Sequence, residues 1–304
     1  MLNRRKFIQR SLGTVLVLAT NSIFNEALAK SSFTKLTILH TNDMHSRIES
    51  FSSDDKKFAG RGGMATRAAL IKQIRREEKN VLLLDSGDIF QGTPYFNFFG
   101  GEVEFKLMSQ MKYDAATLGN HDFDAGLEGL LQQLPNANFP FLNVNYDFSK
   151  TILNGHIQQY KIFQFEKIKV GVFGIGIELE GLVPKKLFGD ILYHHPVEKA
   201  NYFASVLKHE YKCDYIICLS HLGYKHNSSK ISDVLLAAET ENIDMILGGH
   251  THTFMQQPDN VKAKNGKPCI ISQSGWAGLL MGKTDIIFDE KNKCLTTNFS
   301  QVKI

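Results

Sequence analysis

Residues 36–45 read LTILHTNDMH, an apolar run that ends in a group of polar side chains able to bind a metal ion. The same arrangement recurs at residues 81–88 (VLLLDSGD), 115–124 (AATLGNHDFD), 215–223 (YIICLSHLG) and 245–252 (MILGGHTH). Continuous apolar runs of this length are typical of strands that are covered on both faces. Polar residues just beyond such strands occupy the place where α/β folds bind ligands. The pattern therefore predicts functional residues gathered at one edge of a sheet.

Helical stretches separate these strands. Residues 63–78 carry apolar side chains at helical spacing, and residues 195–211 begin with Pro196, which is favoured in a first helical turn. A shorter apolar run at residues 141–144 predicts a further strand. The alternation of strands and helices indicates an α/β fold, and hairpin-like strands near the end of the chain indicate mixed sheets. With no internal repeat or linker, residues 30–304 are expected to form a single domain.

The charge of the chain is concentrated at its N-terminus. The 304 residues carry a formal charge of +4, with 35 basic and 31 acidic side chains. Four of the basic residues (Arg4, Arg5, Lys6, Arg10) and one acid (Glu26) lie in residues 1–29, which leaves 31 basic and 30 acidic residues in the remainder. That balance does not favour a nucleic-acid-binding surface. A hydrophobic content of 43% excludes a disordered or fibrous chain.

Residues 1–29 resemble an export signal. The paired Arg4 and Arg5 precede a short apolar stretch at residues 11–20, and Ala27-Leu28-Ala29 is typical of a cleavage site. The apolar stretch is too short for a membrane anchor, which needs about 20 residues. No cysteine follows the small residues, so a lipid anchor is not expected. We expect twin-arginine export to the periplasm and a mature protein without a membrane span.

The four cysteines show no spacing typical of a zinc site. Cys218 and Cys269 lie within or beside apolar runs, and buried free thiols are the preferred interpretation for them. Cys213 and Cys294 complete the set. A disulfide remains an alternative in an oxidising compartment, and sequence alone does not give its pairing.

The candidate metal-binding residues gain weight from their joint pattern. A single loop histidine is more often a solvated side chain than a ligand. Five clusters that all follow strands are expected to converge on one rim, however, and carboxylate, imidazole and amide oxygen ligands suit Mn²⁺, Zn²⁺ or Fe²⁺. Two ions about 3.5–4 Å apart need a bridging carboxylate. Asp88, in the second of the five clusters, is the expected bridge.

These clusters resemble the motifs of the calcineurin-like metallophosphoesterases, and most closely those of the secreted 5′-nucleotidase / UDP-sugar hydrolase branch. The resemblance rests on residues 40–45, 87–88, 119–124, 220–221 and 249–252, in that order. It implies an αββα sandwich with two divalent metal ions; Mn or Zn is favoured, with Fe, Mg and Ca left open. The implied ligands are Asp43, His45, Asp88 and His252 for one ion, and Asp88, Asn120, His221 and His250 for the other. His252 is the least certain of them.

The resemblance also implies a mechanism. Water activated between the two ions attacks the phosphoryl group directly, and no phosphoenzyme forms. His121 stabilises the transition state or protonates the leaving oxygen, and Asp124 orients its ring. A helix N-cap is the alternative structural role of Asp124. The expected substrates are phosphate monoesters, with 5′-nucleotides first.

Several alternatives stay open. The enzyme could cleave cyclic nucleotides or the pyrophosphate of nucleotide sugars, and a related exported branch hydrolyses sulfur-bound groups. A metal-binding protein without catalysis is disfavoured by the complete ligand set. Family members usually continue into a second domain that grips the nucleotide, which this sequence is expected to lack. A separate polypeptide could supply that domain, and an aromatic cluster at residues 95–99 could be part of its docking face or a packed loop.

Overall fold

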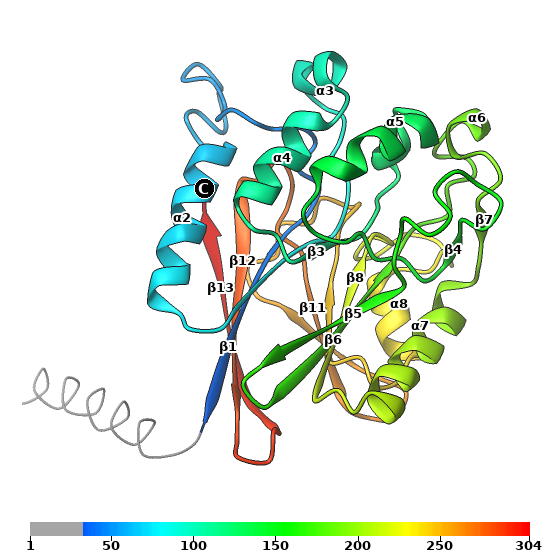
Figure 1. Ribbon diagram of the computed structural model, residues 1–304. Helices are drawn as coiled ribbons and strands as arrows, with labels where there is room; N and C mark the ends of the chain where they lie inside the picture. Colours follow the sequence, from blue (N-terminus) through cyan, green and yellow to red (C-terminus); the bar gives the residue numbers. More distant parts are fainter. Residues whose placement is uncertain (1–32) are drawn as a thin grey trace, which may run out of the picture.

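The computed structural model describes residues 33–304. Two β-sheets pack face to face, and helices cover the outer face of each sheet (Figure 1). This arrangement is the αββα sandwich that the family resemblance implied, and the mixed sheets of the prediction are confirmed. The expected export signal, residues 1–29, lies outside the described residues.

The first sheet has the strand order β13-β12-β1-β2-β3. Its strands are β1 (Thr34–Thr41), β2 (Val81–Asp85), β3 (Ala115–Ala116), β12 (Leu280–Phe288) and β13 (Cys294–Lys303). β1, β2 and β3 run parallel, while β12 pairs antiparallel with β1 and with β13. The parallel strands therefore end at the same edge of the sheet.

The second sheet has the order β10-β11-β9-β8-β6-β5. Its strands are β5 (Tyr160–Phe165), β6 (Ile168–Ile175), β8 (Tyr215–Ser220), β9 (Met245–Leu247), β10 (Asp259–Lys262) and β11 (Pro268–Ser272). The four central strands run parallel, and the edge strands β5 and β10 run antiparallel to their neighbours. A separate two-stranded sheet pairs β4 (Tyr146–Asp147) with β7 (Leu192–Tyr193).

The helices divide between the two outer faces. In the part of the chain that the structure describes, the α-helices are α2 (Met64–Glu77), α3 (Pro94–Phe99), α4 (Glu102–Gln110), α5 (Gly126–Gln133), α6 (Lys185–Phe188), α7 (Pro196–Ser205) and α8 (Asp233–Glu239). α2 and α4 cover the first sheet, and α7 and α8 cover the second (Figure 1). Within residues 33–304, no helix combines the length and apolar character needed to cross a bilayer.

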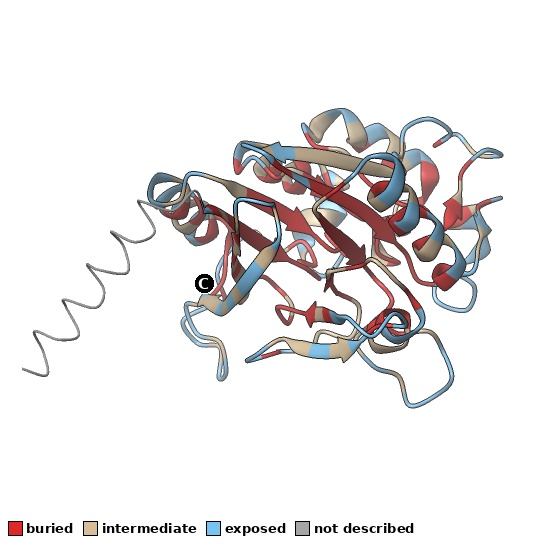
Figure 2. Ribbon diagram, turned by 90° about the horizontal axis from the view of Figure 1, so that it is seen from below, coloured by how far each residue is buried: buried red, intermediate tan, exposed pale blue. Residues whose placement is uncertain are grey.

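Side-chain alternation along the strands builds three hydrophobic layers. In β2, Leu82 and Leu84 point into the interface between the two sheets, whereas Leu83 packs against the helices outside. Val170 and Val172 of β6 meet the first pair from the opposite sheet. Because both faces of the central strands are buried (Figure 2), each strand reads as a continuous apolar run.

Several local predictions need correction. The strand predicted at residues 141–144 is wrong. This segment pairs with its neighbours at single positions, in isolated bridges, and no continuous ladder of hydrogen bonds forms. The helix predicted at residues 195–211 is α-helical to Ser205 and continues as a π-helix from Val206 to Glu210. The residues that contain the aromatic cluster form α3 rather than a loop. The four cysteines are free thiols, as the preferred interpretation held.

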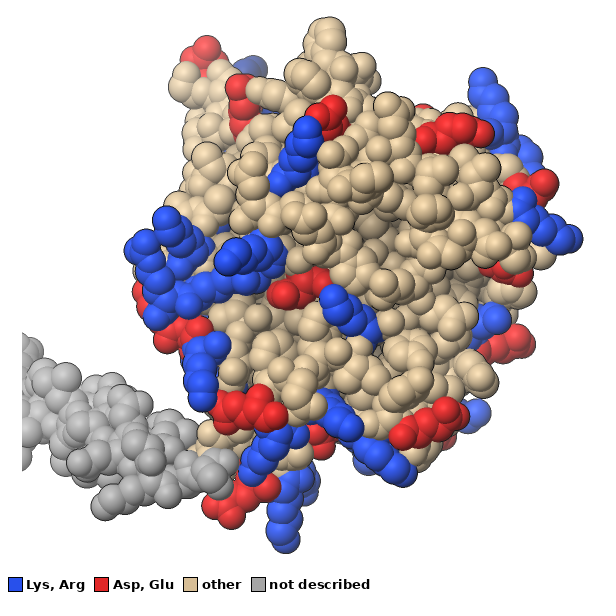
Figure 3. Space-filling view, in the orientation of Figure 1, with Lys and Arg blue, Asp and Glu red and all other residues tan. Residues whose placement is uncertain are grey.

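The surface charges are mixed in sign. On the face shown in Figure 3, Lys and Arg gather over the C-terminal half of α2, where the last turn contains Arg75 and Arg76. Arg75 approaches Asp114 at 3.4 Å, so part of this charge is paired. Elsewhere on the face, basic and acidic side chains alternate (Figure 3).

Candidate active site

The five polar clusters converge at the rim where the parallel strands of both sheets end. Within the first sheet, the last residue of β1 lies beside Asp85 of β2, and Asp85 lies beside Ala116 of β3. Between the sheets, the hydroxyl of Ser86 donates a hydrogen bond of 2.7 Å to the carbonyl of Leu247 at the end of β9. The turns that follow these strands therefore surround one small region, as the sequence predicted.

One group of metal-binding atoms comprises Asp43, His45 and His252. The Nε2 atoms of the two imidazoles lie 2.9 Å apart, and that of His252 lies 3.4 Å from Asp43 Oδ1. The backbone N–H of His250 donates to both oxygens of Asp43 at 2.9 and 3.0 Å, which fixes this carboxylate between the two sheets. Asn42 donates a further bond of 2.6 Å to Asp43 Oδ2.

The second group comprises Asp88, His221 and His250. Nε2 of His221 lies 3.1 Å from Asp88 Oδ2 and 3.9 Å from Asp43 Oδ1. The Nδ1 of His250 lies 2.9 Å from the side-chain oxygen of Asn120, which brings Asn120 into the same group. Asp88 Oδ2 also lies 3.9 Å from His45 Nε2, so this one carboxylate borders both groups.

The residues fit two cations on chemical grounds. His221 is fully buried, yet its Nε2 has no hydrogen-bond partner of good geometry. His45 and His252 direct ring nitrogens at each other, an arrangement in which at most one nitrogen can donate. Buried polar atoms normally find partners, and nitrogen and carboxylate oxygen atoms are the ligands that Mn²⁺ and Zn²⁺ accept. Two cations, one in each group, would give these nitrogen and oxygen atoms partners.

The backbone at the rim is held in an uncommon conformation. Six polar residues that carry or flank the groups have positive φ, a region that non-glycine residues rarely adopt: Asp43, His45, Ser46, Asp88, His250 and His252. Glycines permit the close approach of the turns. A Cβ on Gly119 would collide with the carboxylate of Asp88, and one on Gly249 would come within 2.9 Å of His221 Nδ1. Such local strain is found where surrounding structure fixes a functional site.

Burial and neighbouring charges set the proton affinities in the site. Burial lowers the pKa of His250 to about 4, because the charged imidazolium is poorly solvated there, and it lowers the pKa of His45 in the same way. Burial would also lower the pKa of His221, but the carboxylates of Asp88 and Asp43 outweigh it and raise that pKa to about 10. The pocket therefore stabilises a positive charge beside its two carboxylates.

His121 and Asp124 form a hydrogen-bonded pair at the same rim. Nδ1 of His121 lies 2.8 Å from Asp124 Oδ2, and this hydrogen bond raises the pKa of His121. The imidazole is 38% exposed, so it can reach a substrate. The alternative role of Asp124 as a helix N-cap is wrong, because Ala125 occupies that position of α5. The backbone N–H of His121 donates to Asp88 Oδ1 at 2.8 Å, which ties this pair to the second group.

Asp122 has a structural role that the sequence pattern did not assign. Its buried carboxylate accepts four backbone N–H bonds: Oδ2 accepts from Asp88 at 3.0 Å and Gly119 at 2.8 Å, and Oδ1 accepts from Ile89 at 2.9 Å and Phe90 at 3.2 Å. Burial and the nearby Asp88 raise the pKa of Asp122, while the four donors favour its ionised form. Asp122 thus holds the turn that carries Asp88. Its place inside the motif GNHDFD was the only sequence signal for it.

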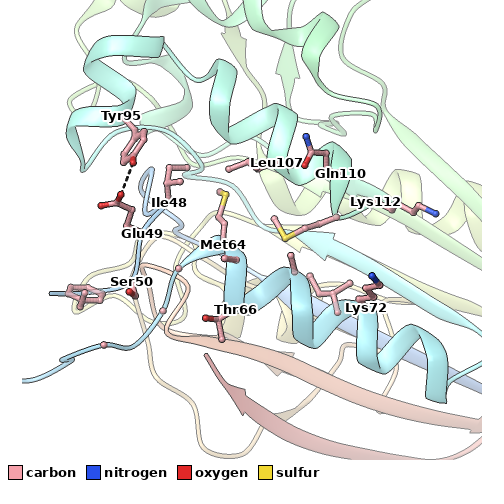
Figure 4. A pocket seen from close by; sticks show the side chains of 18 of the residues that line it. Ile48, Glu49, Ser50, Met64, Thr66, Lys72, Tyr95, Leu107, Gln110 and Lys112 are labelled. Carbon is pink, nitrogen blue, oxygen red and sulfur yellow. Dashed lines mark hydrogen bonds between the residues drawn. The ribbon is translucent and has the colours of Figure 1, made fainter. Parts of the chain in front are cut away.

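Two cavities help to locate the substrate. One, of about 1470 Å³, is a groove between α2 and the α3–α4 segment, where Tyr95 donates a hydrogen bond to Glu49 (Figure 4). None of the candidate metal-binding residues lines this groove. A cavity of about 410 Å³ is lined instead by His45, His121 and His252. The smaller cavity is therefore the one that opens on the site.

The fold and the site together define a class of protein. The family model of calcineurin-like phosphoesterases matches residues 36–254, and the chain belongs to that family. It is 35% identical over 293 residues to the snake venom 5′-nucleotidase of Crotalus adamanteus, covering 90% of this chain and 48% of that protein. The human 5′-nucleotidase is 31% identical, with 87% of this chain and 48% of the relative covered.

The comparison with solved structures also finds a 5′-nucleotidase. The 5′-nucleotidase precursor from Thermus thermophilus superposes with a TM-score of 0.79 at 30% identity, covering 89% of this chain and 55% of that one. The chain thus spans about half the length of the relatives it matches. The resemblance to metallophosphoesterases drawn from the five motifs is confirmed.

Proposed function

We propose that the protein is a metal-dependent phosphohydrolase that cleaves phosphate monoesters, with 5′-nucleotides as its substrates. The observation that carries the proposal is the placement of two groups of metal-binding atoms beside the hydrogen-bonded pair His121–Asp124. The relatives named 5′-nucleotidases, at identities of 30% or more, support the substrate class.

The proposed ligand assignment follows the two groups. Asp43, His45, Asp88 and His252 would hold one ion, and Asp88, Asn120, His221 and His250 would hold the other. The contact of Asp88 with both groups supports its role as the bridge. Mn²⁺ and Zn²⁺ are the favoured ions, because imidazole and carboxylate ligands are mixed here. When bound, two such ions supply Lewis acidity to the phosphoryl oxygens and lower the pKa of a water molecule.

His121 supplies the proton that the leaving group needs. Its Nδ1 faces Asp124, which leaves Nε2 for the substrate. A water oxygen bonds to phosphorus as the bond between phosphorus and the ester oxygen breaks, and the ester oxygen takes the proton from Nε2, so that phosphate and an alcohol are released. Asp124 fixes the ring and favours its protonated form, since the carboxylate raises the pKa of His121.

A substrate panel tests this function. The purified protein is stripped of metal by chelation and assayed with Mn²⁺ or Zn²⁺ on AMP, p-nitrophenyl phosphate and bis-p-nitrophenyl phosphate. We expect turnover of the two monoesters only when metal is restored, and loss of both activities in Asp88→Ala. Preferential cleavage of the diester would favour phosphodiester hydrolysis instead. Failure to cleave any of the three with any divalent ion would show that the proposal is wrong.

Export belongs to the proposal as well. The paired Arg4 and Arg5 and the small residues at Ala27 and Ala29 support twin-arginine transport to the periplasm with removal of residues 1–29. We expect the protein recovered from the periplasm to begin at Lys30, as measured by intact mass. Replacing both arginines with lysine should leave the uncleaved precursor in the cytoplasm, whereas unchanged export would exclude the twin-arginine route.

A separate subunit that contributes substrate contacts is the last part of the proposal. The chain matches about half of each curated relative, which supports contributions from outside this domain. Purification from native cells under mild conditions, followed by AMP turnover with and without any co-purifying chain, tests this. A monomer with full nucleotidase turnover would contradict it.

A further inference from the structure

The cavity beside the candidate metal site is lined in part by residues that have no role in the proposed phosphoryl transfer. Besides its three histidines, the cavity is lined by Arg47, Gln91, Gly92 and Trp276. Its volume of about 410 Å³ lies in the range of small-ligand pockets, about 300–1,000 Å³. A phosphate group alone would fill little of this space, so the cavity has room for the leaving group.

Trp276 is a fixed aromatic surface. Its ring lies parallel to that of His252, with centroids 5.9 Å apart and an interplanar angle of 13°. Phe51 and Phe58 meet it edge to face at 6.1 and 6.4 Å. The next residue, Ala277, donates its backbone N–H to the carbonyl of Asp43 at 2.8 Å, which ties this segment to the candidate metal site. The indole is therefore held in place before any substrate arrives.

Arg47 provides a second planar group at the same cavity. Its guanidinium lies 4.2 Å from the centroid of the Phe51 ring. Within residues 33–304, no carboxylate lies within 4.0 Å of it, and its Nε has no hydrogen-bond partner. A cation stacked in this way and left without an acidic partner is available to a ligand. Guanidinium planes and indole rings are both groups on which nucleobases stack.

We propose that this cavity is a subsite for a planar aromatic leaving group, in which the base of a nucleotide packs against Trp276 and Arg47. The inference rests on the proposed phosphohydrolase function, because the phosphoryl group must sit at the candidate metal site next to the cavity. It assigns part of the base recognition to this catalytic domain itself. Substrates with the same phosphate but no flat ring lose the contact.

Two substrates that differ only in the base provide the kinetic test. AMP and ribose 5-phosphate are compared by kcat/KM in the wild type, Trp276→Ala and Trp276→Phe, with metal content measured for each. We expect Trp276→Ala to lower kcat/KM for AMP by about tenfold or more, mainly through KM, since a stacked base contributes this much to binding. The loss for ribose 5-phosphate should be several-fold smaller, and Trp276→Phe should recover most of the activity on AMP.

Matched variants separate stacking from other effects. Arg47→Lys keeps the positive charge but removes the planar guanidinium group. It should therefore also lower kcat/KM for AMP more than kcat/KM for ribose 5-phosphate. Tyr202→Ala removes a ring that is 63% exposed on α7 and does not line the cavity, so it should leave the ratio of the two substrates unchanged. An equal loss on both substrates in Trp276→Ala would overturn the inference, since Trp276 would then act only by supporting His252.

A binding readout is independent of turnover. Trp276 is the only tryptophan in the chain, so its fluorescence reports directly on this cavity. We expect adenosine to quench the emission in a saturable way and ribose to leave it unchanged. No saturable change with adenosine would contradict the subsite. If the wild-type protein cleaves AMP and ribose 5-phosphate equally well, the proposed subsite is wrong and the proposed function stands. If it cleaves neither substrate with any metal, the proposed function is wrong.

Discussion

Substitution of Asp122 by Asn tests how the candidate site is built. The change keeps the size of the side chain and one carbonyl oxygen, but it replaces the other oxygen with an NH₂ group. That NH₂ group would face two backbone N–H donors, either those of Asp88 and Gly119 or those of Ile89 and Phe90. Two of the four hydrogen bonds are therefore lost whichever way the amide is turned.

The expected magnitude follows from these two bonds. Hydrogen bonds to a charged group contribute about 1.5–3 kcal/mol each, so the loss is about 3–6 kcal/mol. Part of it should appear as lower stability and part as weaker metal binding, because Asp88 sits in the turn that Asp122 holds. If half of it appears in metal binding, affinity for Mn²⁺ falls about tenfold to a hundredfold, since 1.4 kcal/mol corresponds to a factor of ten.

The assay is a calorimetric titration of chelated protein with Mn²⁺, together with thermal unfolding without metal. Asp114→Asn is a matched control. Asp114 accepts a backbone N–H bond of 2.8 Å from Leu83, the middle residue of β2, and it belongs to neither group of metal-binding atoms. The control should lose some stability and no metal affinity. If Asp122→Asn binds Mn²⁺ and unfolds like the wild type, Asp122 does not hold the Asp88 turn.

Three further outcomes follow from the structure. His121→Ala should lower turnover by about 10²–10⁴-fold while the metal content stays unchanged. Asp88→Ala should lose both metal and activity. Equal loss of metal in the two variants would show that the role of His121 is misassigned. Asp124→Asn should shift the alkaline limb of the kcat/KM profile to lower pH, because activity needs protonated His121 and the Asp124 hydrogen bond raises its pKa; an unmoved limb would contradict this. Burial raises the pKa of Asp244 to about 6 from an ordinary value of 3.8, so its contribution to stability is lost as pH rises between those values. In urea unfolding of metal-free protein, Asp244→Asn should therefore be more stable than the wild type by up to about 3 kcal/mol at pH 7.5 and by little at pH 4, and a gap independent of pH would refute the cause.

The central strands and their polar turns could be predicted from sequence because the information is local. A run such as residues 81–85 is apolar at every position because both of its faces are covered, and the turn after it carries Asp88. The isolated bridges at residues 141–144 could not be distinguished from a strand, because ladder formation depends on partners far away in the chain. The π-helical end of the segment at residues 206–210 is equally invisible in apolar periodicity.

By itself the sequence determined which residue types lie at the carboxyl ends of which strands, and parallel pairing places such ends at one rim. The division of these residues into two groups, which followed from the sequence only through a family resemblance, depends physically on the tertiary structure. Asp43 joins His252, 209 positions further along the chain, because the sheets pack face to face and bring β1 near β9. The same packing turned Asp122 inward to four backbone N–H groups and placed Trp276 beside His252. Contacts between distant segments depend on the relative placement of two sheets, which no local pattern encodes.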